Sequence, residues 1–154
     1  MQYELTTPCT AADLAPLKAG DTVLLSGVVY TARDQAHKRM LEALDKGEKL
    51  PFDLEGSAIY YVGPTPERPD EVIGSAGPTT SGRMDAMSPR LLDLGNKIMI
   101  GKGKRDAAVK EAVVRNGAVY LAALGGAGAL MAQSVQTLEA VSYTHLTLPT
   151  ILLV

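Results

Sequence analysis

Apolar, β-rich runs alternate with helical patterns along most of the chain, and this alternation is the feature that most limits the possible fold. The strand-like runs are residues 21–30, 57–62, 97–100 and 118–122, and the helical patterns cover 31–47, 88–94 and 105–115. Strands separated by crossover helices pair in parallel, because each helix packs back on a face of the sheet. The sequence therefore predicts an α/β fold with a mixed, largely parallel sheet flanked by helices.

Short signals predict where these elements begin, bend and end. Thr31, with Asp34 three residues later, suits the N-cap of the first helix, and Ser88 before a proline suits the N-cap of the second. Gly117 after Asn116 predicts the end of the third helix, and Gly27 predicts a break or bulge in the first strand. A Gly-rich stretch at 125–128 is expected to open one more helix.

Charge, apolar runs and cysteine content exclude several functions. The chain has 154 residues, 15 Lys and Arg, and 17 Asp and Glu, which describes a single domain without the basic surface that binds nucleic acid. No apolar run reaches the roughly 20 residues needed to span a bilayer, and the start lacks a secretion signal, so a cytoplasmic location is expected. Cys9, the single cysteine, cannot alone hold a metal centre, so any metal chemistry must come from another chain.

Residues 141–154 differ in composition from the rest of the chain. The segment VSYTHLTLPTILLV contains no Asp, Glu, Lys, Arg, Ala or Gly, and it looks like the translation of a sequencing adapter. We therefore predict a domain at residues 1–140 and a non-native tail at 141–154, in which His145 has no function. The tail would replace a final helix and strand, and their loss would expose an apolar sheet edge. The alternative is an ordinary C-terminal strand, since Leu, Thr, Ile and Val favour β structure.

Three polar turns follow predicted strands, where backbone N–H groups and helix N-termini collect ligands in α/β folds. The first, residues 30–39, places Arg33 and His37 four residues apart on one helical face. A cation in the first helical turn opposes the helix dipole, so a bound anion would explain Arg33. The alternative is a solvated basic face in which Asp34 pairs with its neighbours.

The other two turns each combine glycines with a cation. Residues 77–85, GPTTSGRMD, hold three hydroxyl groups and Arg83, which can cradle a carboxylate or phosphate but lack the Walker A spacing. Residues 100–104 place Lys102 between two glycines. A structural Ser/Thr turn and an ordinary surface turn are the respective alternatives. Together, Arg33, Arg83 and Lys102 suit a small dianion such as a dicarboxylic acid, while a complete catalytic apparatus is missing, so the chain looks like half of an active site.

Four long motifs, in order, resemble the beta subunit or C-terminal domain of the iron–sulfur class I fumarate hydratase and L-tartrate dehydratase family. They are LSGVVYTARDQAHKR (25–39), LPFDLEGSAIYYVGPTP (50–66), VIGSAGPTTSGRMD (72–85) and MIGKG (99–103), within a match from about residue 3 to 140. Gly82 departs from the family, whose members more often carry a larger residue there. The resemblance implies a domain like the swivelling β/β/α domain of aconitase-like enzymes, which closes over a [4Fe–4S] cluster held by three cysteines of an alpha subunit.

The resemblance also implies roles for five residues. Arg33, Arg83 and Lys102 would bind substrate carboxylates, and Thr79 would lie beside the reacting carbon as a candidate for the proton transfer. His37 would be a neighbouring site residue or one that supports the site. The implied activity is a hydro-lyase, active only with its alpha subunit in a hetero-oligomer, that hydrates fumarate to malate or acts on tartrate. A non-catalytic anion-binding or assembly module and a free-standing isomerase or lyase are the alternatives.

Overall fold

The computed structural model describes residues 1–63, 67–123, 132–133, 135–142 and 148–153, which form a sheet with helices on both faces. The strands are β1 (Gln2–Thr6), β2 (Thr22–Thr31), β3 (Ala58–Tyr60), β4 (Ile98–Gly101), β5 (Val119–Ala122), β6 (Val135–Ser142) and β7 (Leu148–Leu153). The helices are α1 (Ala11–Leu14), α2 (Asp34–Asp45), the 3-10 helix η1 (Ser81–Met84), α3 (Ser88–Asp93) and α4 (Ala107–Asn116).

The sheet is mixed and largely parallel, which confirms the predicted α/β fold. Its seven strands follow the order β5-β4-β3-β2-β7-β6, with β1 paired to β2 outside this path. The β1/β2, β2/β3, β3/β4 and β4/β5 pairs are parallel, and β7 is antiparallel to both β2 and β6. The carboxyl ends of β2, β3 and β4 therefore lie at one edge, and the three polar turns follow from that edge.

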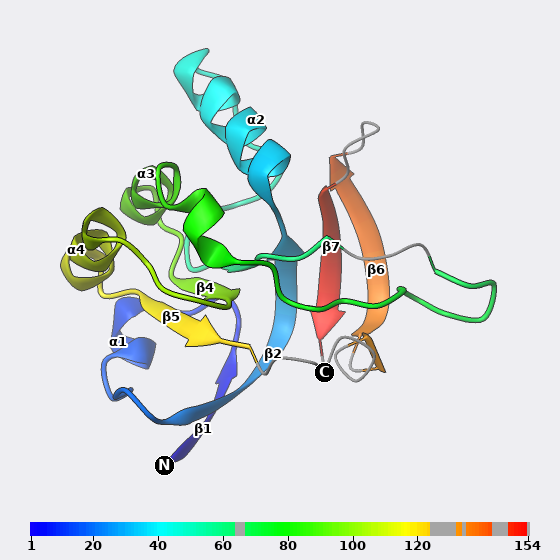
Figure 1. Ribbon diagram of the computed structural model, residues 1–154, viewed down its shortest axis with the longest axis horizontal. Coiled ribbons are helices and arrows are strands. Elements are labelled where there is room, and N and C mark those ends of the chain that lie inside the picture. The colour runs from blue at the N-terminus through cyan, green and yellow to red at the C-terminus, as the bar shows by residue number, and fades with distance from the viewer. Residues whose placement is uncertain (64–66, 124–131, 134, 143–147, 154) are drawn as a thin grey trace.

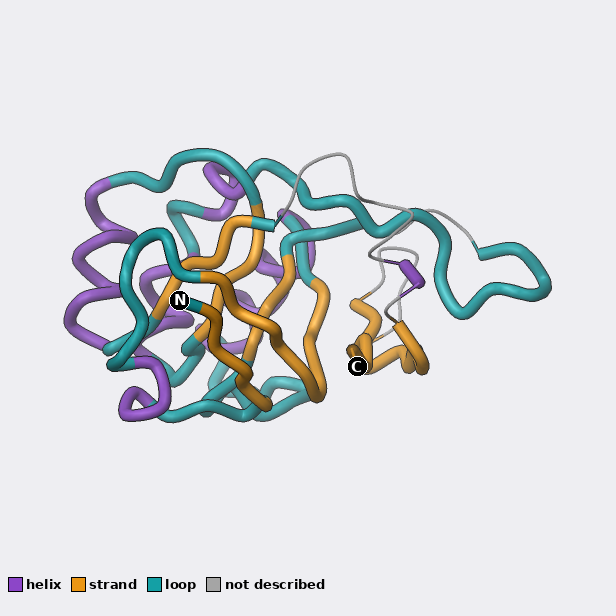
Figure 2. Tube along the Cα trace, turned by 90° about the horizontal axis from the view of Figure 1, so that it is seen from below, coloured by secondary structure: helices purple, strands orange, loops and turns teal. Residues whose placement is uncertain are grey.

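Alternate residues of the central strands enter two hydrophobic cores. Ile59, Tyr61 and Met99 pack with the buried faces of α2, α3 and α4, while Tyr60 and Ile98 pack on the opposite face with residues from the segment around α1. Figures 1 and 2 show α2, α3 and α4 grouped on one side of the strands, and the long loop between β3 and η1 extending away from them. Among the described residues, no helix is both long and apolar enough to cross a membrane.

The sequence located the main strands and helices, but two predicted caps are wrong. Thr31 continues β2, where it pairs with Tyr60 of β3, and α2 has Arg33 as its N-cap instead. A β-branched threonine suits the parallel ladder better than the cap. Ser88 lies inside α3, where its hydroxyl donates to the Met84 carbonyl, so it does not cap that helix.

The predicted end of α4 is confirmed, whereas β2 continues through Gly27 instead of breaking there. Gly117 adopts the left-handed conformation at φ +59°, which favours glycine at a helix end. Gly27 has φ +104° inside β2, and a Cβ there would lie 2.6 Å from the Thr7 hydroxyl oxygen. The described elements that the sequence analysis missed are β1, α1, η1 and β6, and a strand within 141–154, here β7, was expected only as the alternative for that segment.

Two C-terminal strands, β6 and β7, include residues of the segment at 141–154. Residues 148–153 form β7, which pairs with the second half of β2 over Gly27–Tyr30. The prediction that residues 141–154 are non-native stays a prediction. The helix expected at 125–128 and His145 lie outside the described residues.

Candidate substrate site at the ends of β2, β3 and β4

Arg33 stands between the end of β2 and the first turn of α2. Its backbone is extended, and its exposed guanidinium lies against Gly63 just after β3, where an added Cβ would be 2.7 Å from Arg33 Cζ. Arg33 is thus the N-cap rather than a residue of the first turn, and Asp34 supplies the acidic group that the helix dipole favours there. The missing side chain at Gly63 leaves room for the guanidinium.

His37 follows Arg33 by about one turn of α2 and has no exposed surface. Its Nδ1 is 2.9 Å from the Arg33 carbonyl oxygen, and since a carbonyl only accepts, Nδ1 carries the hydrogen. Burial, with a smaller contribution from the Arg105 charge, lowers the pKa of His37 to about 4, against the opposing effects of the Arg33 carbonyl and Asp34. The imidazole is therefore neutral at pH 7, and its buried Nε2 has no hydrogen-bond partner among the described residues.

The second turn is held to the first and to β3. The Thr79 backbone N–H donates to the Tyr61 carbonyl at 2.7 Å, and Thr79 itself is half-buried. Arg83 lies in η1 with an exposed side chain, and its Nη1 is 4.0 Å from Asp34 Oδ2. Asp34 thus pairs with a cation of another turn. The alternative of a solvated basic face had Asp34 paired with its neighbours.

The third turn is joined to the second through the backbone. The Ser81 N–H donates to the Lys102 carbonyl at 2.9 Å, and Thr80 forms an isolated parallel bridge with Lys102. Gly101 permits this approach, because a Cβ there would collide with the Ser81 hydroxyl and lie 3.0 Å from the Tyr61 ring. The Lys102 side chain is exposed.

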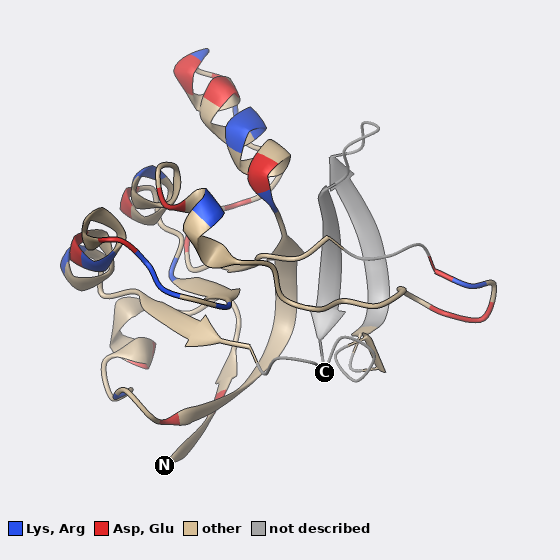
Figure 3. Ribbon diagram, in the orientation of Figure 1, with Lys and Arg blue, Asp and Glu red and all other residues tan. Residues whose placement is uncertain are grey.

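The structure thus brings the three predicted turns together at one edge of the sheet. Figure 3 shows basic segments at the start of α2, in η1 and in the turn after β4. Within the described part of the chain, the Arg33 and Lys102 charges have no ion-pair partner, whereas Arg90, Arg105 and Arg115 each pair with an aspartate. An edge with unneutralised cations can bind a small anion.

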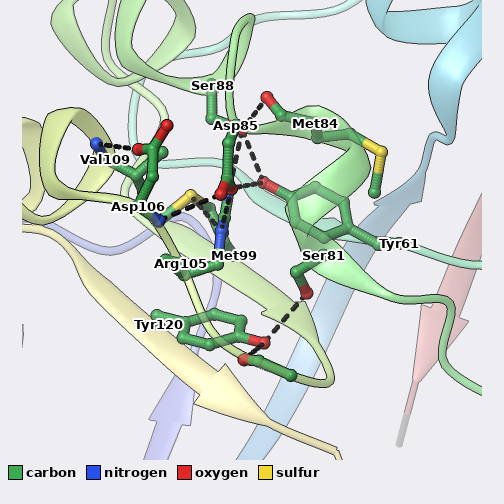
Figure 4. A network of polar contacts seen from close by, with 11 residues as sticks. Tyr61, Ser81, Met84, Asp85, Ser88, Met99, Arg105, Asp106, Val109 and Tyr120 are labelled. Atoms are coloured by element: carbon green, nitrogen blue, oxygen red, sulfur yellow. Dashed lines mark hydrogen bonds and ion pairs between the residues drawn. The ribbon is translucent and has the colours of Figure 1, made fainter.

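A buried polar network behind these turns was missed by the sequence analysis (Figure 4). Arg105 Nε donates to Asp85 Oδ1 at 2.7 Å, and the two side chains are 3% and 14% exposed. Tyr61, Ser88 and Tyr120 complete the surroundings of the guanidinium. Asp85 lies in one of the quoted motifs, but only the fold shows that Arg105 reaches it, since 20 residues separate them.

The described residues contain no grouping of three or more His, Cys, Asp or Glu side chains that could hold a metal ion. Cys9 is buried beside Gly56, to whose carbonyl it donates its backbone N–H. The residues that the structure describes therefore do not fit a metal cluster by themselves.

Comparison with known proteins gives the family. The family model described as Fumarase C-terminus matches residues 1–154. The chain belongs to this family. The predicted resemblance is thereby confirmed.

Named relatives fall into two groups. The chain is 42% identical over 137 residues to a putative L(+)-tartrate dehydratase subunit beta of Methanocaldococcus jannaschii, covering 87% of this chain and 70% of that protein. It is 33% identical over 152 residues to the L(+)-tartrate dehydratase subunit beta of Escherichia coli K12, covering 97% and 74%. It is 38% identical over 137 residues to the aerobic class I fumarate hydratase of the same strain, covering 88% of this chain and 25% of that protein.

Proposed function

We propose that the chain is the beta subunit of a heteromeric hydro-lyase, which reversibly adds water to a small dicarboxylate. Fumarate and malate are the first choice of substrate pair, and tartrate is the second. The observation that carries the proposal is that the turns containing Arg33, Thr79, Arg83 and Lys102 lie together at the ends of neighbouring strands, in a chain related to subunits of dehydratases and to a hydratase.

The three cations would bind the two carboxylates of the substrate. Each guanidinium can donate two parallel hydrogen bonds to a carboxylate, while the Lys102 ammonium acts as a point charge. Loss of a proton next to a carboxylate moves negative charge onto that carboxylate, and cations already in place stabilise the charge as it develops. The exposed Arg83 and Lys102 side chains support this role because substrate can reach them.

Thr79 would lie beside the reacting carbon and take part in the proton transfer. Its backbone is fixed to the Tyr61 carbonyl at 2.7 Å, which supports a defined position for its hydroxyl group. A threonine hydroxyl is far too weak an acid to act alone near neutral pH, so a group on the partner chain must assist. His37, fully buried and neutral, would support the site by holding the Arg33 carbonyl.

The partner in this proposal is an alpha subunit that carries a [4Fe–4S] cluster through three cysteines. A cluster bound there would supply Lewis-acid chemistry at the substrate hydroxyl group. The beta-subunit names of the tartrate dehydratase relatives support a heteromeric assembly. We propose a cytoplasmic location for the complex.

Replacement of Arg83 by Ala tests the proposal. In the complex assembled with the alpha subunit, R83A should lower turnover of the dicarboxylate by about 100-fold or more, because a preorganised charge near the developing anion is lost. The control is R90A, which removes an exposed arginine paired with Asp45 outside the three turns. Assembly of R83A with undiminished turnover would instead favour a non-catalytic anion-binding or assembly module.

A further inference from the structure

We propose that Arg105 is a positioning residue, which sets the Arg83 turn and the Lys102 turn at the spacing that a dicarboxylate requires. The inference rests on the proposed function, which it deepens by adding a residue that does not touch the substrate.

The first support is the number of segments that meet at the Arg105 guanidinium. Nε donates to Asp85 Oδ1 at 2.7 Å, Nη1 approaches the Met99 sulfur at 3.3 Å, and Nη2 donates to the Ser88 hydroxyl at 2.9 Å and the Tyr61 hydroxyl at 3.4 Å. A planar guanidinium with five N–H donors can satisfy these directions at once, whereas a lysine ammonium cannot. One buried side chain thus joins the end of β3, the start of α3 and β4.

The second support is that the guanidinium lies between two tyrosine rings. Its carbon is 5.2 Å from the centre of the Tyr61 ring and 5.1 Å from that of Tyr120. Contacts with ring faces favour a cation and fix the plane of the guanidinium further. The Tyr120 hydroxyl then reaches the Lys102 turn, because it lies 2.9 Å from the Gly103 carbonyl and 2.9 Å from the Ser81 hydroxyl.

The third support is that the residues joined by Arg105 lie close in sequence to Arg83 and Lys102. Asp85 accepts from the Asp106 backbone N–H through its second oxygen at 2.9 Å, so both of its oxygens are held by the two residues that follow the Lys102 turn. Arg83 is two residues before Asp85, and Lys102 is three residues before Arg105. Arg83 and Lys102 are themselves exposed, so their placement depends on the backbone that this network holds.

The test compares three variants of the complete enzyme, assembled with its alpha subunit. R105K keeps the buried charge but loses the fork, and Y120F keeps the ring over Arg105 but loses the hydroxyl that joins Gly103 to Ser81. R115K is the control, because it makes the same change in an arginine that pairs with Asp93 between α3 and α4. Steady-state kcat and KM are measured for fumarate and for tartrate.

Misplaced cations bind the substrate less well, so R105K should raise the KM of the dicarboxylate about 10-fold or more. Y120F should raise it about 3-fold, and R115K less than 2-fold. A change that only lowers the amount of folded enzyme reduces the apparent kcat and leaves KM unchanged. A reduced kcat with an unchanged KM in both R105K and Y120F would overturn the inference. If R105K fails to assemble with the alpha subunit, the KM of Y120F alone decides.

A double-mutant cycle gives the second readout. If Arg105 acts through Lys102, the effect of R105K on kcat/KM should shrink at least 3-fold when Lys102 is already replaced by Met. Equal effects in both backgrounds would overturn the inference while leaving the proposed function intact. An assembled wild-type enzyme that hydrates or dehydrates neither dicarboxylate would overturn the proposed function and the inference together.

Discussion

The neutral, buried His37 predicts a specific dependence of stability on pH. Burial holds its pKa at about 4 in the folded chain, against 6.5 for an exposed histidine. Between these two values the unfolded chain binds a proton that the folded chain does not, so stability is complete above pH 6.5 and falls as the pH decreases to 4. Since one pKa unit corresponds to about 1.4 kcal/mol, the loss attributable to His37 is about 3 kcal/mol.

Replacement of His37 by Asn isolates this loss. The Asn amide can still donate to the Arg33 carbonyl, but it does not titrate. In urea unfolding of the chain at pH 7 and at pH 4, the free energy of unfolding should fall by about 3 kcal/mol more in the wild type than in H37N. Carboxylates that titrate in this range are present in both proteins and cancel in the comparison.

Two results would refute the reasoning about His37. The first is an equal fall of the unfolding free energy in both proteins between pH 7 and pH 4. The second is an imidazole proton resonance, identified by its absence from H37N spectra, that titrates near pH 6.5.

Three further predictions concern Gly63, Leu92 and the C-terminal segment. Gly63→Ala should displace the flexible Arg33 guanidinium, raising the KM of the dicarboxylate several-fold with little change in Tm, and an unchanged KM would argue against the Arg33 role. Leu92→Ala removes a fully buried side chain between α3 and the sheet and should cost about 2–5 kcal/mol of unfolding free energy, measured by urea unfolding. Long-read sequencing of the source locus through the Ala140 codon should reveal codons for a further helix and strand in place of those for residues 141–154.

Much of the fold was predictable because its periodic signals are strong. The strands near residues 58, 98 and 119 are short runs of apolar residues between turn residues, and the helix at Ala107–Asn116 ends at a glycine with positive φ. Its N-cap is Asp106, whose side chain accepts from the Val109 N–H, and its first residue, Ala107, lies two residues after the predicted start at 105. Boundaries fixed by local chemistry are therefore close to those expected.

The remaining features depend on contacts that are distant in sequence. Thr31 looks like a cap in sequence, yet pairing with β3 keeps it in the sheet. The four-residue helix at Ala11–Leu14 is too short for periodicity to show it. Arg105 was assigned to a helix start, and only folding brings it to Asp85 and to the tyrosine rings.

The candidate site likewise has features that the sequence predicts and features that only the fold shows. Arg83 and Lys102 are predicted from cations beside glycines in turns after strands, and Arg33 from a cation at the start of a helix; the fold places the three turns side by side. The burial of His37 and the contact of Arg33 with Gly63 could not be predicted from spacing, because both depend on contacts with residues just after β3, Tyr61 and Gly63. Roles in binding and catalysis remain proposals.

The most direct test of the central claim is turnover by the two-chain enzyme. The chain is purified together with the iron–sulfur alpha subunit under anaerobic conditions, and malate formation from fumarate and dehydration of tartrate are followed for the complex and for each chain alone. We predict turnover of one of these dicarboxylates by the complex and none by either chain alone. Turnover by this chain without its partner, or a fully assembled complex inactive on both, would contradict the account.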